Sequence, residues 1–469
     1  MMKLKKIVCV LLTTLIATAG ISGCSGADSS KPEGSTGKTD SAVTDTSGKS
    51  GTVTEIRFTE WDGGETLKVY ESIADAFNKE NPDIHVTIMN IPDEYDTKIT
   101  TMVAGNDIPE ISMLDAAALL FPYAEEGIVL NMNDFIQKDA SFDSSILMDQ
   151  FKYNLTSDYL AGYGIGSENI CMFFNPALFE KYGVEEPPAK YSDAWDWVTF
   201  VENAKKLTID KNGKNALSTD FDSENIDVYG LSFDKWWAMY MPFVTSNGGS
   251  FLSEDGKSLT LTDKAAIDAL QKMQDLIYVD HVAPTPTQSQ NMPGLSEAIA
   301  TNKVAMQISG QWSNESLMTD GISYNVAALP KMGDKAGTLA TFGSVALMNT
   351  GKADAAWEFV KYLLSEGACM PLYQSGLWLP TTAPEYNEEF IKSFVGENHP
   401  ANYLDSIVAP MMDNTAASPV PLYVRNFNKI NDALTPAFDV IWSGEKPVAD
   451  ALAEVQATAN EQVDGFFGK

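Results

Sequence analysis

Cysteine and histidine are scarce in this chain. Its 469 residues include four cysteines and three histidines. Cys9 and Cys24 lie near the N-terminus, so only Cys171 and Cys369 remain for the rest of the chain. Both have apolar sequence neighbours, and we expect two buried free thiols rather than a disulfide. Because no Cys/His cluster has the spacing of a zinc site, the sequence predicts no metal centre and no Cys–His nucleophile, and it points to no cofactor.

Basic residues and long apolar runs are also lacking. The chain has 32 Lys and Arg against 64 Asp and Glu, which gives a formal net charge of −32. This balance argues against nucleic acid as a partner, because its binding requires clustered Lys and Arg. It also argues against the folded body lying on anionic lipid. Beyond the N-terminal region, no segment approaches the ~18 apolar residues of a membrane-spanning helix.

The N-terminal residues have the pattern of an export signal. Three lysines precede an apolar run over residues 7–19, which is too short to span a bilayer as a stable helix. The sequence Ile21-Ser22-Gly23-Cys24 follows, and it resembles the lipobox of bacterial lipoproteins, whose cysteine is acylated. We therefore expect residues 1–23 to be a lipoprotein signal peptide and Cys24 to carry the lipid. The alternative is an ordinary signal with a chance cysteine.

The stretch that follows Cys24 is typical of a linker. Residues 25–52 are rich in Ser, Thr, Gly, Asp and Lys, and Val43 is their only sizeable aliphatic residue. Such a stretch cannot bury enough apolar area to offset the entropy of ordering it. Residues 24–52 are therefore predicted to be the lipidated cysteine and a disordered linker. They would hold a folded body at the extracytoplasmic face of the cell membrane, with the lipid as its sole membrane contact.

The body begins with alternating strand and helix patterns. Strands are expected near residues 56–58, 84–88 and 111–114, and helices between them, which implies a mostly parallel sheet covered by helices. Ligands of such sheets bind at the carboxyl ends of the strands. The side chains predicted at those ends are Glu60, Trp61, Asp62 and Asp115.

Several short motifs occur in the order and spacing of one known family. Together they resemble the extracellular solute-binding proteins of carbohydrate ABC importers over nearly the whole body. The motifs are Glu80-Asn81-Pro82-Asp83-Ile84, Ile108-Pro109-Glu110-Ile111, Phe173-Phe174-Asn175-Pro176, Asp193-Ala194-Trp195, Gly248-Gly249, Gly310-Gln311-Trp312, Ala355-Ala356-Trp357 and Leu379-Pro380-Thr381. Two positions depart from the family pattern. Glu110 stands in place of the usual Asp, and Asp115 in place of an aromatic residue, and both bear on the substrate rather than on the fold.

The resemblance implies a two-lobe periplasmic-binding-protein-like fold of the α/β class. Each lobe would be a mostly parallel sheet flanked by helices, with a ligand cleft at the hinge. Lobe one would comprise residues 53–167 and 343–397, and lobe two residues 168–342 and 398–469.

Sugars present apolar faces to aromatic rings and hydroxyl groups to carboxylates, amides and guanidinium groups. By resemblance, Trp312 occupies the place of a stacking tryptophan and Glu168 that of a carboxylate near the hinge. Trp236 and Trp237 are adjacent, so an extended segment would point one toward the sugar and the other into the core. Weaker candidates are Trp378, Tyr423 and Arg425. Four other tryptophans are assigned to packing: Trp195, Trp197, Trp357 and Trp442.

The predicted function is capture of a mono- or oligosaccharide and its delivery to the transmembrane subunits of an ABC permease, by a monomeric protein without catalytic activity. One alternative is a secreted carbohydrate-active enzyme that uses paired carboxylates such as Asp115 and Glu168. Another is a receptor that senses sugar without transporting it. The carboxylates also leave open a cationic ligand, either an amino sugar or a polyamine.

Overall fold

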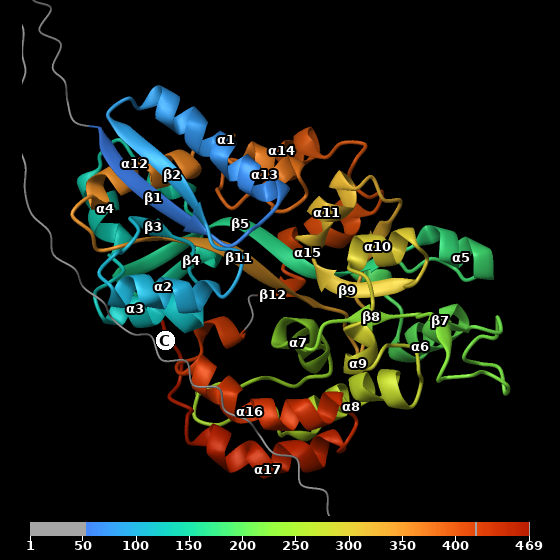
Figure 1. Cartoon of the computed structure of the whole chain (residues 1–469). Coiled ribbons are helices and arrows are strands. Elements are labelled where there is room, and N and C mark those ends of the chain that lie inside the picture. The colour runs from blue at the N-terminus through green and yellow to red at the C-terminus, as the bar shows by residue number, and fades with distance from the viewer. Residues whose placement is uncertain (1–52, 418–419, 469) are drawn as a thin grey trace, which may run out of the picture. The chain divides into compact units, whose positions relative to one another are not determined.

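The computed structural model describes residues 53–417 and 420–468 (Figure 1). The predicted signal peptide, Cys24 and the linker lie outside the described residues. From residue 54 onward, strands and helices alternate as the hydrophobic pattern predicts. They are β1 (Thr54–Glu60), α1 (Glu65–Glu80), β2 (Ile84–Asn90), α2 (Tyr95–Ala104) and β3 (Ile111–Ser112). β1 pairs in parallel with β2 and β3, which confirms the predicted β-α-β-α-β unit.

Periodicity explains why α1 forms and where it packs. Tyr70, Ile73 and Phe77 recur at helical spacing, and all three are buried against the sheet. Lys79 and Glu80 complete the last turn, and Pro82 lies just beyond the helix, where a missing backbone N–H costs no helical hydrogen bond. The helix therefore returns the chain to the sheet edge, where β2 begins.

The long strand β5 (Tyr159–Phe174) joins the two lobes. Its first half pairs with β4 (Lys152–Thr156) and β11 (Thr338–Leu347). Its second half pairs with β9 (Met306–Gly310) and β10 (Asn325–Ala327). All four pairings are antiparallel, so the ten-stranded sheet is antiparallel around β5 and parallel around β1, in the order β2-β1-β3-β11-β5-β9-β8.

The remaining elements are helices that pack on this sheet, two further strands of it, β8 and β12, and the strands β6 and β7, which form a separate antiparallel pair. The remaining strands are β6 (Ile209–Asp210), β7 (Ile226–Val228), β8 (Ser232–Phe233) and β12 (Ala416–Ala417). The helices are α3 (Phe121–Glu125), α4 (Met132–Lys138), α5 (Pro176–Tyr182), α6 (Trp197–Leu207), α7 (Trp237–Ser246), α8 (Lys264–Tyr278), α9 (Pro286–Ser289), α10 (Leu295–Ala300), α11 (Ser313–Thr319), α12 (Ala353–Leu363), α13 (Met370–Gln374), α14 (Glu388–Phe394), α15 (Ala409–Met412), α16 (Phe427–Trp442) and α17 (Val448–Asn460).

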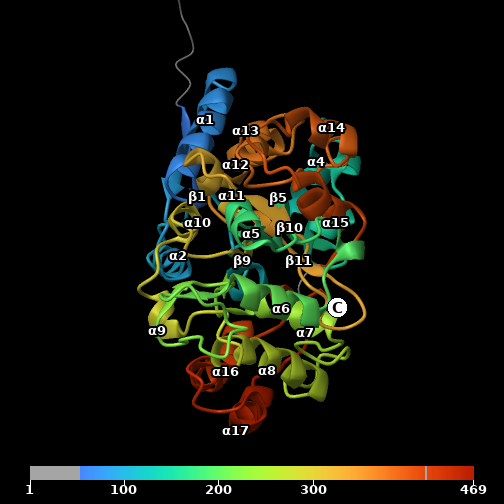
Figure 2. The ribbon, with the colours of Figure 1, turned by 90° about the vertical axis from the view of Figure 1, so that its right-hand side faces the viewer.

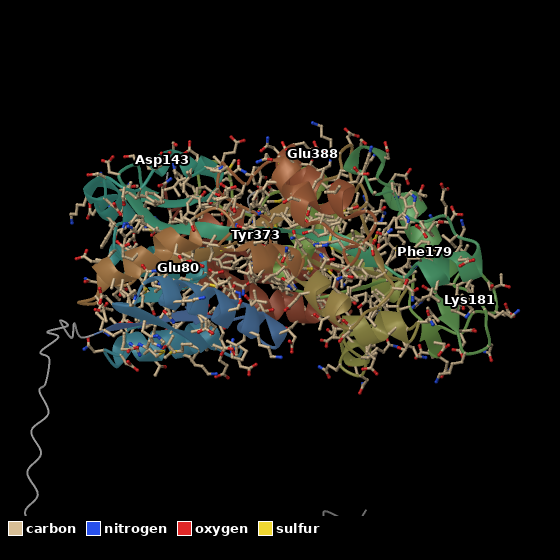
Figure 3. The ribbon with its side chains drawn as sticks, turned by 90° about the horizontal axis from the view of Figure 1, so that it is seen from above. Glu80, Asp143, Phe179, Lys181, Tyr373 and Glu388 are labelled. Atoms are coloured by element: carbon tan, nitrogen blue, oxygen red, sulfur yellow. The ribbon has the colours of Figure 1, made fainter. Side chains whose placement is uncertain are left out.

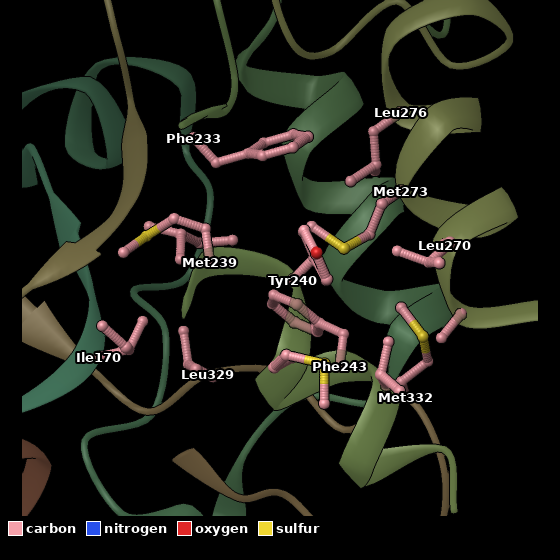
Figure 4. Packing of buried hydrophobic residues seen from close by; sticks show 14 of the residues in the cluster. Ile170, Phe233, Met239, Tyr240, Phe243, Leu270, Met273, Leu276, Leu329 and Met332 are labelled. Carbon is pink, nitrogen blue, oxygen red and sulfur yellow. The ribbon is translucent and has the colours of Figure 1, made fainter. Parts of the chain in front are cut away.

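Two large hydrophobic cores lie on either side of the β5 crossing. The β1 core, which includes Phe58, Phe77 and Phe359, packs beneath α1, α12 and α13. The α7 core includes residues of α7, α8, α16 and α17. Figure 4 shows part of it, with Tyr240 and Phe243 of α7 close to Leu270 and Met273 of α8. Figure 2 shows these two groups of helices at opposite ends of the view. Two separate cores are what a two-lobed body requires, while the lobe boundaries given above stay predictions.

The thiols and the surface follow the composition. Cys171 and Cys369 are buried and free, as predicted. Acidic side chains such as Glu80, Asp143 and Glu388 extend outward from the ribbon, whereas Tyr373 is buried (Figure 3). In the part of the chain that the structure describes, no helix is long and apolar enough to cross a membrane.

Candidate ligand-binding site

A cavity of about 340 Å³ opens where the ends of several strands meet. Its volume lies within the roughly 300–1,000 Å³ typical of small-molecule sites. It is lined by Trp61, Tyr95, Asp96, Leu114, Asp115, Ala116, Tyr153, Glu168, Trp236, Trp237, Trp312, Thr341, Phe342 and Leu422. Three other cavities, of about 420, 500 and 560 Å³, are larger, but no tryptophan lines any of them. We take the smaller cavity as the candidate site because it combines aromatic rings with carboxyl groups.

Backbone geometry accounts for the position of each lining side chain. Trp61 directly follows β1, and Tyr95 is the first residue of α2. Asp115 follows β3 and caps a π-helical segment, where its Oδ1 accepts the backbone N–H of Ala118 at 2.8 Å. Glu168 and Thr341 are partners in the β5–β11 pairing, and the Thr341 hydroxyl donates to Glu168 Oε1 at 3.0 Å.

Aromatic rings line the cavity in two groups. Trp61 and Tyr95 meet edge to face, with ring centroids 5.4 Å apart. In the second group, the ring centroid of Trp236 lies 5.5 Å from that of Trp237 and 6.4 Å from that of Trp312. Trp236 remains 41 % exposed, so its ring has a large free surface. Together these rings provide flat apolar faces to the cavity.

Trp312 is held in place by a close approach to the backbone. It follows β9, and its indole lies over Gly310, where an added Cβ would come within 2.0 Å of the ring carbon Cζ3. The ring also packs against both the β1 core and the α7 core. A glycine at position 310 is therefore what allows Trp312 to reach the cavity between the lobes.

Trp236 and Trp237 depart from the expected arrangement. Both line the cavity, although Trp237 also packs edge to face on Phe427. The alternation of a strand does not apply because α7 begins at Trp237, with Trp236 as its extended N-cap. The change from extended to helical backbone between them keeps both indoles on the cavity side.

The carboxyl groups of the site have raised pKa values. Burial, together with the charge of Asp62, raises the pKa of Glu168 to about 8, against the opposing hydrogen bond from Thr341. Burial and the neighbouring Asp115 raise the pKa of Asp96 to about 6. Burial also raises the pKa of Asp115, although the backbone N–H of Ala118 opposes this shift. A raised pKa means that the cavity disfavours the ionised form of these acids.

Glu60 and Asp62 lie behind the cavity wall rather than on it. Glu60 is fully buried; its Oε1 accepts the amide of Asn90 at 2.7 Å, and its Oε2 has no partner among the described groups. Burial raises the pKa of Glu60 to about 7. Asp62 accepts the hydroxyl of Tyr70 at 3.1 Å, and burial raises its pKa to about 6, with Glu315 contributing.

Three weaker candidates do not line the cavity. Trp378 is 2 % exposed and packs on the backbone at the β5–β11 crossing and edge to face on Tyr70. Tyr423 stacks at 6.3 Å behind Tyr153, which does line the cavity. Arg425 lies 4.4 Å from the ring centroid of Phe467 and forms an ion pair of 2.6 Å with Glu125.

The tryptophans assigned to packing all lie outside the cavity. Trp357 and Trp442 are buried, and Trp195 and Trp197 are half-buried against the α7 core. Within residues 53–417 and 420–468, no group of three or more His, Cys, Asp or Glu could hold a metal ion.

Sequence reasoning missed several lining residues. Tyr95 and Asp96 follow β2, so the rule that places ligands at strand ends would have found them if applied to that strand. Thr341 and Phe342 reach the cavity only because β11 pairs with β5, some 170 residues earlier in the chain. No local sequence pattern predicts such a pairing.

Comparison with known proteins gives a consistent result. The sequence profile of the family described as bacterial extracellular solute-binding protein matches residues 62–368. A multiple sugar-binding protein of Streptococcus mutans is 22 % identical over 326 residues, which cover 66 % of this chain and 70 % of that protein.

Solved structures show the same fold. An ABC substrate-binding protein from Listeria monocytogenes, in complex with cycloalternan, aligns with a TM-score of 0.73 and 24 % identity over 87 % of this chain and 98 % of its own. The maltose/maltodextrin-binding domain from Bdellovibrio bacteriovorus, bound to maltotriose, aligns with a TM-score of 0.67 and 21 % identity over 87 % and 99 %. These likenesses confirm the two-lobed α/β fold.

Proposed function

Since the chain belongs to the bacterial extracellular solute-binding proteins, we propose that it captures a mono- or oligosaccharide for an ABC importer. The observation that carries this proposal is the composition of the cavity. Trp61, Trp236 and Trp312 offer ring faces, and Glu168 and Asp115 offer oxygen atoms at the same opening. Ring faces match the C–H surfaces of a sugar, and carboxyl oxygens match its hydroxyl groups.

The place of the cavity in the fold supports capture by closure. Trp61 packs on the β1 core, whereas Trp237, the first residue of α7, packs on the α7 core, and Trp236 directly precedes it. Glu168 and Thr341 lie between them on the strands that cross from lobe to lobe. A sugar that contacts both sides stabilises the closed arrangement, because only there do all the contacts form together.

Named relatives add support for a carbohydrate ligand. The Streptococcus mutans relative is named for sugar binding, and the Listeria and Bdellovibrio structures contain cycloalternan and maltotriose. Each of these ligands belongs to that protein. Their shared chemistry, together with the aromatic walls of this cavity, favours a carbohydrate here.

The proposal includes a membrane tether and a permease. Cys24 would carry the lipid, residues 25–52 would act as the spacer, and the closed, loaded monomer would dock on the transmembrane subunits of the importer. The sequence Ile21-Ser22-Gly23-Cys24 and the low apolar content of the spacer, with Val43 as its only sizeable aliphatic residue, support this arrangement. A tether of this kind keeps the binding body close to its permease and so raises their effective concentration.

A binding screen with a test for turnover examines the proposal. The purified body is mixed with mono- and oligosaccharides, unfolding temperature and heat of binding are measured, and the sugars are recovered and analysed. We expect one saccharide class to raise the unfolding temperature and to be recovered unchanged. Trp236→Ala should weaken binding, while Trp195→Ala, which removes a half-buried tryptophan outside the cavity, should leave the affinity unchanged. Release of shortened sugars would instead identify the carbohydrate-active enzyme.

A further inference from the structure

Charge in the cavity is of one sign. Asp96, Asp115 and Glu168 line it, and no Lys, Arg or His does so among the described residues. Three further carboxyl groups are coupled to Glu168 directly or through Asp62: Asp62 itself, just after β1, Glu60 at the end of β1, and Glu315 in α11. These acids come from five parts of the fold: the end of β1, α2, β5, α11 and the segment that follows β3. Negative charge therefore reaches the cavity from several elements rather than from one.

Basic groups near the cavity are occupied elsewhere. Lys235 directly precedes Trp236, but its Nζ donates to the backbone carbonyl of Phe233 at 2.9 Å and to the Ser289 hydroxyl. The same Nζ lies 4.8 Å from the centre of the Phe233 ring. No described cation therefore neutralises the carboxyl groups of the cavity.

The acids act on one another, which makes their ionisation costly. Burial is the main cause of the raised pKa values of these acids, and neighbouring charges add to it: Asp62 raises the pKa of Glu168, Glu315 that of Asp62, and Asp115 that of Asp96. In addition, Glu60 Oε2 is buried without a hydrogen-bond partner beside this group. A neutral sugar could use these acids as hydrogen-bonding groups, but it would do nothing to relieve the repulsion that their ionised forms create.

The aromatic walls favour a positive charge for an independent reason. Indole faces carry a negative quadrupole potential and attract ammonium groups, with tryptophan the strongest of the three aromatic side chains. Trp61, Trp236, Trp237 and Trp312 all border the same space as the carboxyl groups. Ring faces and acids thus provide complementary contacts for one ligand that carries both an apolar surface and a cation.

We propose that this cavity selects saccharides that carry a protonated amine, that is amino sugars, over their neutral counterparts. The ammonium group would lie within reach of Glu168 and form a charge-assisted hydrogen bond there, while the sugar rings would pack between the tryptophans. This inference rests on the proposed capture of a carbohydrate and names the class of carbohydrate. A simple polyamine would satisfy the acids but would leave the flat indole surfaces without a matching face.

The proposal predicts a distinctive pH dependence. Affinity for the amino sugar passes through a maximum between pH 5 and pH 8. The carboxyl groups of Asp62, Asp96, Glu60 and Glu168 lose protons as the pH rises, while the sugar amine, which titrates near an α-amino group at about 7.7, loses its charge toward pH 8. Added salt weakens this binding, since it screens the attraction between ammonium and carboxylate. For the neutral sugar of the same linkage, affinity changes little with pH or salt.

The experiment compares three matched ligands by titration calorimetry. They are glucosamine oligosaccharides, their N-acetylated forms and glucose oligosaccharides of the same linkage, each measured at pH 5, pH 6.5 and pH 8, with galactose-based sets as a second series. At pH 6.5 we expect the amine form to bind at least about 10-fold more tightly than either neutral form, and at pH 8, where the amine is mostly neutral, this preference should shrink. Glu168→Gln should remove most of this preference, and Asp96→Asn, at an exposed position, provides a second variant that is safe for folding. Glu180→Gln, an exposed acid on α5, serves as the matched control and should preserve the preference.

Different failures separate the two proposals. If the neutral forms bind as tightly as the amine form, the amino-sugar inference is overturned and sugar capture stands. Retention of the full preference in both Glu168→Gln and Asp96→Asn would also overturn it. If no saccharide binds and spermidine does, both proposals fail, because the site then recognises the cation alone.

Discussion

The close packing of Trp378 at the β5–β11 crossing yields a quantitative prediction. Gly166 and Gly343 are paired across the two strands, and the indole of Trp378 lies over both. A Cβ at position 343 would lie 2.3 Å from ring carbon Cζ2 and 2.7 Å from Cη2. Ordinary contact begins near 3.4 Å, so the ring or the strand would have to move by about 1 Å.

Trp378 has little room to make that movement. It is 2 % exposed, and its ring meets Tyr70 edge to face at 5.9 Å. Tyr70 is itself buried and donates to Asp62. Overpacking of this kind in a dense core costs about 1–3 kcal/mol, and we expect Gly343→Ala to lower the free energy of unfolding by that amount.

Urea unfolding followed by circular dichroism measures this loss, and a double-mutant cycle locates it. In a Trp378→Leu background, Gly343→Ala should cost less than about 0.5 kcal/mol, because the clashing ring is gone. Gly351→Ala is the matched control, since a Cβ there meets nothing within 4 Å and the backbone needs no positive φ. If Gly343→Ala is as stable as Gly351→Ala, or if the cycle shows no coupling, the packing argument is wrong.

Three further predictions concern ligand binding, pH and the tether. Trp312→Ala should weaken saccharide binding by about 2 kcal/mol, or roughly 30-fold in Kd by calorimetry, because it removes a central indole face; a loss under threefold would place the sugar elsewhere. Without ligand, the unfolding temperature of the protein should fall as the pH rises from 5 to 8. Its buried acids bind protons more tightly in the folded state than in the unfolded state. Their contribution to the free energy of unfolding is therefore complete below about pH 4, and it is lost as the pH rises through their raised pKa values of about 6 to 8. Glu168→Gln should make the unfolding temperature depend less on pH. An unchanged pH dependence would contradict the assignment of part of it to Glu168. Cys24→Ser should release folded, sugar-binding protein from the membrane into the aqueous fraction; a variant that stays with the membrane would refute the lipobox.

Much of the fold could be predicted because its signals are local. The apolar face of α1 and the strands on either side appear in the sequence at the spacing that the structure shows. Parallel strands place their carboxyl ends at one sheet edge, so Trp61 and Asp115 could be selected before any coordinates were known. The two free thiols could be predicted from their apolar neighbours in the same way.

Choosing among the tryptophans required the tertiary structure. Trp312 and Trp378 are both large aromatic residues near glycines, yet Trp312 faces the cavity and Trp378 is buried at the crossing. The difference depends on which strand passes beneath each ring. Which strand lies beneath each ring is set by contacts between residues far apart in the chain. Burial of an indole stabilises the protein equally well beside the cavity and at the β5–β11 crossing, so hydrophobicity alone does not distinguish the two positions.

The sequence by itself determined the α/β class, the resemblance to solute-binding proteins and a set of aromatic and acidic candidates at strand ends. Periodicity, turn residues and motif order are local properties that one chain carries without its partners. Only the tertiary structure decided which candidates share one cavity, that Tyr95, Thr341 and Phe342 join them, and that no basic side chain within residues 53–417 and 420–468 does. The reason is physical: a cavity and its electrostatic field arise from contacts such as that between Glu168 and Thr341, which are 173 residues apart and meet only when β11 pairs with β5.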